Sequence, residues 1–137
     1  MLEKIHHLGY AVESVEAASR FYRASFGAEP TGPESVEEQG IVATMFLVGD
    51  SMIELMQPTH LDSPVGRFLA KRGVGFHHVA FQVEDIEGAL GELRDSGVEL
   101  VDEVPKLGAG GTRTAFIHPK GTFGVLTELV ELPDRDR

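Results

Sequence analysis

The sequence predicts an α+β fold built from two tandem βαβββ modules. Residues 6–18 and 77–89 are copies of one another, with six of thirteen positions identical. A second pair of matching segments, Met-Ile-Glu-Leu from Met52 and Leu-Thr-Glu-Leu from Leu126, lies seventy-four residues apart. Hydrophobic alternation and helix caps recur in the same order after each copy, so we interpret the chain as an internal repeat of one supersecondary unit.

The first module is predicted to contain a strand, a helix and a hairpin. Residues 5–12 alternate between apolar and other side chains, as a strand should. Ser14 is suited to cap a helix whose apolar residues are spaced three to four apart, and Gly27 ends it. Residues 31–40 are polar and are predicted to be a loop. Residues 41–48 and 52–57 are apolar runs separated by Gly-Asp-Ser, which predicts a hairpin.

The second module repeats this order after a connector helix. Ser63 and Pro64 begin the connector, residues 63–72, and Gly73 ends it. Residues 76–83 form a predicted strand, Asp85 caps a helix, and Gly97 stops that helix. Residues 98–101, 114–118 and 124–130 are predicted strands, with a glycine-rich loop at residues 107–112. We therefore expect one domain over residues 1–137, with repeat 1 at about 5–58 and repeat 2 at about 76–132.

Composition excludes several classes of function. The formal net charge of −10 argues against nucleic acid or an anionic membrane surface as a partner, because both attract Lys/Arg clusters. The chain has no cysteine, which excludes disulfides, thiolate metal sites and a cysteine nucleophile. No apolar run reaches the length of a membrane span, and no signal-peptide profile is present, so a cytoplasmic location is expected.

Two histidines and two glutamates are candidate metal ligands. His7 shares its strand face with Gly9 and Ala11, and His78 shares its face with Ala80 and Gln82, so small residues leave room beside each imidazole. The carboxylates stand in apolar segments, where an unpaired charge is costly. These carboxylates are Glu54 and Glu128.

A lone histidine on a half-apolar strand is more often a hydrogen-bonded structural residue than a ligand. The recurrence of histidine and glutamate at matched places in both repeats instead favours a divalent cation with open positions for substrate. We therefore predict a curved mixed sheet around a metal site formed by His7, Glu54, His78 and Glu128. The neighbouring His6 and His77 are on the opposite strand faces and are expected to support the site or the structure.

The chain resembles the vicinal oxygen chelate (glyoxalase/bleomycin-resistance-like) superfamily, and within it the methylmalonyl-CoA epimerases. The resemblance runs from about residue 2 to residue 132. It depends on the His, Glu, His, Glu pattern and on several strings, among them Ile-His-His-Leu-Gly and Gly-Phe-His-His-Val-Ala. Matching segments are residues 5–9, 38–42, 63–71, 75–80, 103–111, 116–120 and 124–129.

The resemblance implies a racemase or epimerase that interconverts (2R)- and (2S)-methylmalonyl-CoA, or a related 2-alkylmalonyl-CoA. Such an enzyme transfers a proton at one carbon through an enolate that a divalent metal stabilises. The implied cofactor is Co²⁺, Mn²⁺, Ni²⁺, Zn²⁺ or Mg²⁺, held by the four residues named above. The implied partners are an acyl-CoA substrate and a second copy of the chain in a homodimer.

One position departs from the family pattern. Some bacterial epimerases carry a glutamate, proposed as a base, where this chain has Ala43. The candidates for proton transfer are therefore Glu128, our first choice, Glu54, or a metal-bound water. Lys106, Arg113 and Lys120 are candidate contacts for coenzyme A phosphates or the substrate carboxylate, although solvated surface charges have the same appearance.

Other activities are compatible with the same four positions. A glyoxalase-type lyase, a dioxygenase, or a ligand-binding protein without catalysis would each use this scaffold.

Overall fold

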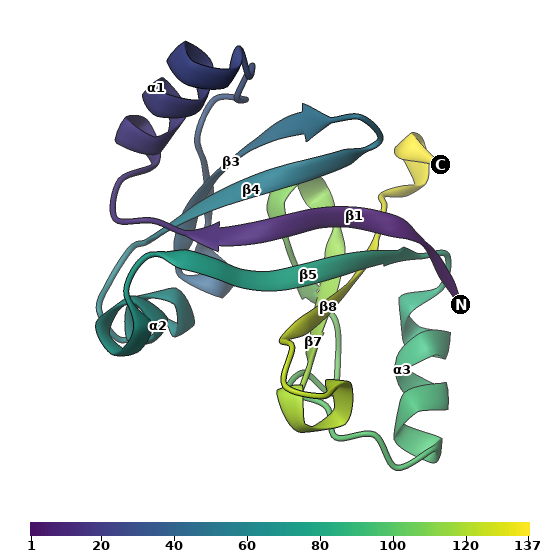
Figure 1. Cartoon of the computed structure of the whole chain (residues 1–137). Coiled ribbons are helices and arrows are strands. Elements are labelled where there is room, and N and C mark those ends of the chain that lie inside the picture. The colour runs from purple at the N-terminus through teal and green to yellow at the C-terminus, as the bar shows by residue number, and fades with distance from the viewer. The chain divides into compact units, whose positions relative to one another are not determined.

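The computed structural model describes residues 1–137, which form two compact units. The first unit contains residues 7–77, and the second unit joins residues 1–6 to residues 78–137. Strand β1 (Leu2–Ala11) begins in the second unit and continues into the first, and β5 (Gly75–Val83) runs from the first into the second (Figure 1). Each βαβββ module occurs as predicted: β1, α1 and three strands, then β5, α3 and three strands.

In the first unit, a mixed sheet has the strand order β2, β3, β4, β1. Strand β4 is parallel to β1, and the other neighbouring pairs are antiparallel. The elements are α1 (Val15–Phe26), β2 (Glu34–Val36), β3 (Ile41–Val48), β4 (Ser51–Pro58) and α2 (Pro64–Arg72). Helix α2 occurs where the connector helix is expected.

The second unit repeats this topology with the strand order β5, β8, β7, β6. Strand β8 is parallel to β5, and the remaining pairs are antiparallel, so this sheet is mixed as well. A hydrogen bond of 3.2 Å from Gln82 Nε2 to Glu3 Oε1 joins β5 to the first residues of β1. The elements are α3 (Ile86–Asp95), β6 (Lys106–Leu107), β7 (Arg113–Ile117) and β8 (Thr127–Glu131).

The structure corrects two predicted boundaries. Residues 34–36, predicted to be loop, form edge strand β2, whose first two residues are exposed and polar and therefore show no apolar alternation. Residues 98–101, predicted to be a strand, form only an isolated bridge between Leu100 and Ile117. Val98 and Leu100 instead pack on the core of this unit, and the strand occurs later, at β6, where the glycine-rich loop was expected to begin.

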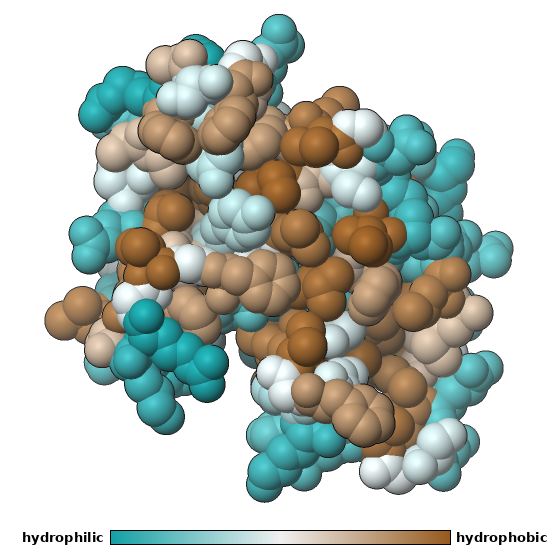
Figure 2. Space-filling view, in the orientation of Figure 1, coloured by the Kyte–Doolittle hydropathy of each residue, from teal (hydrophilic) through white to brown (hydrophobic).

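Each unit buries its own set of apolar side chains. Buried apolar side chains of the first unit include Ile41, Phe46, Leu55 and Met56. Those of the second unit form one cluster: Val83, Ile86, Ala89, Leu90, Ala115, Ile117 and Leu129. Other apolar residues remain at the surface, as the brown side chains in Figure 2 show. None of the helices is long and apolar enough to cross a membrane.

Candidate metal centre

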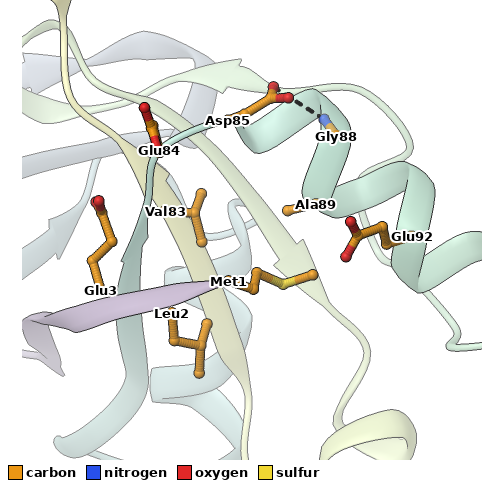
Figure 3. A pocket seen from close by; sticks show the side chains of 9 residues that line it. All are labelled: Met1, Leu2, Glu3, Val83, Glu84, Asp85, Gly88, Ala89 and Glu92. Atoms are coloured by element: carbon orange, nitrogen blue, oxygen red, sulfur yellow. Dashed lines mark hydrogen bonds between the residues drawn. The ribbon is translucent and has the colours of Figure 1, made fainter.

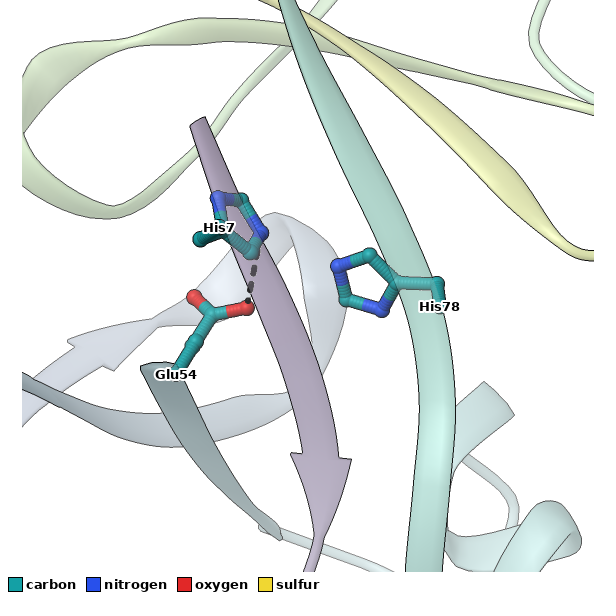
Figure 4. Close-up of side chains that lie close together, drawn as sticks. All are labelled: His7, Glu54 and His78. Carbon is teal, nitrogen blue, oxygen red and sulfur yellow. Dashed lines mark ion pairs between the residues drawn. The ribbon is translucent and has the colours of Figure 1, made fainter. Parts of the chain in front are cut away.

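In the first unit, the fold brings His7 and Glu54 together. Strands β1 and β4 pair in the register that sets Gly9 opposite Glu54. His7 lies two residues before Gly9 and therefore on the same face of the sheet. Its Nε2 atom is 3.4 Å from Glu54 Oε1, and both side chains are buried (Figure 4).

The second unit repeats this arrangement with His78 and Glu128. Strands β5 and β8 set Ala80 opposite Glu128, and His78 again lies two residues earlier on the same face. The distance from His78 Nε2 to Glu128 Oε1 is 3.3 Å. His78 is 1% exposed and Glu128 is 2% exposed. The small residue at the paired position, Gly9 or Ala80, leaves space beside the imidazole in both units.

Both pairs have the chemistry and spacing of metal ligands. Two donors that bind one divalent metal at about 2.1 Å are about 3.0 to 3.4 Å apart, depending on coordination geometry. The observed nitrogen-to-oxygen distances of 3.4 and 3.3 Å match this range. Burying a carboxylate without a positive partner costs free energy, and a bound divalent cation would supply positive charge to these carboxylates.

The strand next to each glutamate contributes a further side chain. In the first unit, Met45 of β3 is the register partner of Glu54, and Ala43 lies two residues earlier on the same face. Ala43 is buried and, by this register, lies on the same face of the sheet as Glu54. In the second unit, Phe116 of β7 is the register partner of Glu128.

The two neighbouring histidines differ in environment. His6 is buried, whereas His77 is half-buried. The ring of His77 packs edge-on against Phe68 of α2, with ring centroids 4.8 Å apart. This contact supports the expected structural role of His77.

Two of the three candidate substrate-binding cations are engaged in ion pairs. Arg113 binds Glu87 at 2.6 Å and Glu131 at 3.2 Å. The hydrogen bond to Glu87, which outweighs the opposing effect of burial, raises the pKa of the Arg113 guanidinium above its ordinary value. Lys106 Nζ lies 3.1 Å from Asp102 Oδ1. These charges are therefore largely compensated within the protein.

Lys120 differs from the other two candidates because its side chain is exposed and forms no ion pair. Its backbone N–H donates a hydrogen bond of 3.1 Å to His118 Nδ1, which fixes the start of the short 3₁₀ turn Pro119–Thr122. This turn precedes β8, and Glu128 is the second residue of that strand. Lys120 is thus the candidate cation that is available to an anionic ligand.

The second unit also contains an acidic cleft of about 370 Å³ (Figure 3). Four carboxylates line it, together with apolar side chains, and none of the predicted site residues does. The carboxylates belong to Glu3, Glu84, Asp85 and Glu92. Because these charges repel phosphates and carboxylates, this cleft does not suit an acyl-CoA.

Sequence reasoning missed Phe116 and the acidic residue that holds it, Asp102. Asp102 Oδ2 accepts a 2.8 Å hydrogen bond from the Phe116 N–H group. The repeat offered a signal, because Phe116 follows Met45 by the same seventy-one residues that separate His78 from His7. Extending the alignment beyond the histidine strands would have identified it.

Comparison with known proteins identifies relatives along the whole chain. Residues 6–116 match the family model of the Glyoxalase/Bleomycin resistance protein/Dioxygenase superfamily. An uncharacterized Bacillus subtilis protein, YqjC, is 41% identical over 95% of this chain and 93% of its own. An ethylmalonyl-CoA/methylmalonyl-CoA epimerase from Cereibacter sphaeroides is 34% identical over 96% of this chain and 100% of its own.

A solved structure agrees in fold as well as in sequence. A variant of Streptomyces coelicolor methylmalonyl-CoA epimerase, with one glutamate replaced by leucine, has been solved in complex with 2-nitronate-propionyl-CoA. It superposes with a TM-score of 0.93 and 40% identity, covering 98% of this chain and 97% of the other. The match to the family model and the similarity to these relatives show that the chain belongs to the Glyoxalase/Bleomycin resistance protein/Dioxygenase superfamily.

Proposed function

We propose that this protein is a metal-dependent epimerase of methylmalonyl-CoA or a related 2-alkylmalonyl-CoA. The observation that carries the proposal is the pair of buried His–Glu contacts, made in the same register in both units. Relatives named as epimerases of these substrates match nearly the full chain, which supports the same reaction here.

The proposed metal site uses both pairs together. His7, Glu54, His78 and Glu128 supply two imidazole nitrogens and two carboxylate oxygens, a donor set that suits Co²⁺, Mn²⁺, Ni²⁺, Zn²⁺ or Mg²⁺. When bound, the cation supplies Lewis acidity toward the substrate oxygens.

Proton transfer at the carbon between thioester and carboxylate requires a base on this chain. Glu128 is our first candidate because its carboxylate is buried beside His78 and Phe116, where water competes little for the proton. Glu54 is the second candidate. Ala43, on the same sheet face as Glu54, has no titratable group and cannot serve as the base that some bacterial epimerases carry at this position.

Substrate binding requires a local positive charge on a chain whose net charge is −10. We assign the first contact with a substrate phosphate or carboxylate to Lys120, which is exposed and without an ion pair. Lys106 and Arg113 would have to leave Asp102, Glu87 or Glu131 to contribute. A homodimer and a cytoplasmic location remain predictions.

Hydrogen exchange at the reacting carbon tests this function. Methylmalonyl-CoA is incubated in D₂O with metal-free protein, with protein supplied with Co²⁺ or Mn²⁺, and with the metal alone. We expect deuterium at C2 only when protein and metal are both present, as mass spectrometry would detect. Absence of deuterium exchange with fully metallated protein would contradict the proposed epimerase activity. Tight binding of the acyl-CoA without exchange would favour a ligand-binding protein, an alternative with which the alanine at position 43 is compatible.

A further inference from the structure

The ring of Phe116 packs edge-on against the imidazole of His78. Their centroids are 5.2 Å apart and the ring planes are 85° apart, a favourable geometry for two aromatic rings. His78 is almost completely buried, whereas Phe116 is half-buried at the end of β7. Because Phe116 is also the register partner of Glu128, one side chain adjoins both members of the His–Glu pair.

The backbone of Phe116 is itself held by Asp102. Asp102 Oδ2 accepts the 2.8 Å hydrogen bond from the Phe116 N–H group, and the Asp102 N–H donates a 3.1 Å hydrogen bond back to the Phe116 carbonyl. Lys106 Nζ, 3.1 Å from Asp102 Oδ1, fixes the other carboxylate oxygen. Both the N–H group and the carbonyl of Phe116 are therefore hydrogen-bonded to Asp102, which fixes the backbone that carries the ring.

We propose that Phe116 is a positioning residue that holds the His78 imidazole in the orientation required for metal binding. An imidazole can rotate about its Cβ–Cγ bond, and only some orientations direct Nε2 toward the cation. A neighbouring ring that blocks the other orientations lowers the entropy lost when the metal binds. This inference rests on the proposed metal site and adds to it a residue outside the ligand set.

The first unit contains the same support with a different side chain. Thr31 Oγ1 accepts a 3.1 Å hydrogen bond from the Met45 N–H group, and the Thr31 N–H donates a 2.8 Å hydrogen bond to the Met45 carbonyl. Met45 thus occupies, opposite Glu54, the place that Phe116 occupies opposite Glu128. A flexible thioether chain restricts its neighbours less than a rigid ring does, so Met45 offers a matched control.

The test compares Co²⁺ binding by the full chain and three variants. Phe116→Met introduces the side chain of the first unit, Phe116→Tyr retains the ring, and Met45→Leu is the control. Loss of a residue that orients a metal-bound histidine weakens binding by about 10- to 100-fold, which we expect for Phe116→Met alone. Titration calorimetry and the visible absorption of bound Co²⁺ measure affinity and ligand geometry. Circular dichroism and urea unfolding verify that each variant is folded. If Phe116→Met does not fold, Phe116→Leu is used in its place.

Equal affinity in Phe116→Met and the unchanged protein would overturn the inference while leaving the metal site intact. Equal losses in Phe116→Met and Met45→Leu would also overturn it, because they would indicate a general packing effect. If the unchanged protein binds no metal, the proposed site fails. NMR of the metal-free protein then tests independently whether Phe116 restricts the His78 ring. Restricted motion of the His78 ring that is lost in Phe116→Met and kept in Phe116→Tyr supports the role, and unchanged motion refutes it.

Discussion

The two units use the same backbone contacts with different side chains. In the first unit, Gln57 Oε1 accepts a 2.9 Å hydrogen bond from the N–H group of Val15, the first residue of α1. In the second unit, Glu131 Oε1 accepts a 3.2 Å hydrogen bond from Ile86, the first residue of α3. Gln57 and Glu131 each lie three residues after the candidate ligand of their strand. An amide and a carboxylate thus anchor equivalent helices.

The difference lies in charge and rigidity. The supporting residues of the first unit are uncharged and include the flexible Met45, whereas those of the second are acidic or aromatic. Glu131 also binds Arg113 at 3.2 Å and Arg137 at 3.1 Å. The geometry of the module therefore requires an acceptor oxygen at these positions but not a charge. The second unit adds ion pairs and an aromatic ring to the same framework, which predicts different roles for the two candidate ligands Glu54 and Glu128.

The largest expected effect distinguishes Glu128 from Glu54. Glu128→Gln removes the proposed proton acceptor while retaining the shape of the side chain, and we expect C2 exchange at saturating Co²⁺ to fall by about 10²-fold or more. Glu54→Gln replaces the carboxylate with an amide whose oxygen can still coordinate the proposed metal, so we expect a loss below about tenfold. Mass spectrometry of deuterium uptake measures both. A greater loss of exchange in Glu54→Gln than in Glu128→Gln would contradict this assignment and make Glu54 the first candidate base.

A smaller effect concerns stability. Glu131→Ala leaves the Ile86 N–H group without its acceptor and removes one ion-pair partner from each of Arg113 and Arg137. We expect it to lower the free energy of unfolding by about 2 to 3 kcal/mol. Gln57→Ala loses only the neutral hydrogen bond, for an expected cost of about 1 kcal/mol. Urea unfolding monitored by circular dichroism measures both, with Glu131→Gln as the control that retains an acceptor. Equal costs would mean that the half-exposed arginine pairs contribute nothing.

The smallest effect should be equal in the two units. Ser14 Oγ and Asp85 Oδ1 each accept a 3.1 Å hydrogen bond from the N–H group three residues later, at the start of α1 and α3. We expect Ser14→Ala and Asp85→Ala each to cost about 1 kcal/mol in unfolding free energy. Thermal and urea unfolding check this, and Asp85→Asn, which keeps a capping oxygen, should lose less than half as much. A clear inequality would show that the modules differ in helix anchoring as well as in charge.

Local patterns predicted the elements that have strong caps or regular alternation. Ser14, Asp85 and the proline after Ser63 marked the helix starts, and the His-His strands marked β1 and β5. Prediction failed where pairing partners decide the structure. Edge strand β2 is mostly polar, whereas Val98 and Leu100 of the predicted strand 98–101 pack on the core instead of joining a strand ladder. Apolar composition alone does not distinguish a segment that pairs as a strand from one that packs on the core without pairing.

The sequence by itself determined the repeat, the α+β class and the four candidate ligands, because duplicated histidine and glutamate positions are visible without coordinates. Only the tertiary structure decided which atoms approach one another. The registers Gly9–Glu54 and Ala80–Glu128 bring His7 and His78 to within 3.4 and 3.3 Å of their carboxylates. Strand register and the contact of Phe116 with His78 join residues far apart in the chain, and such pairings depend on the packed fold rather than on local preference.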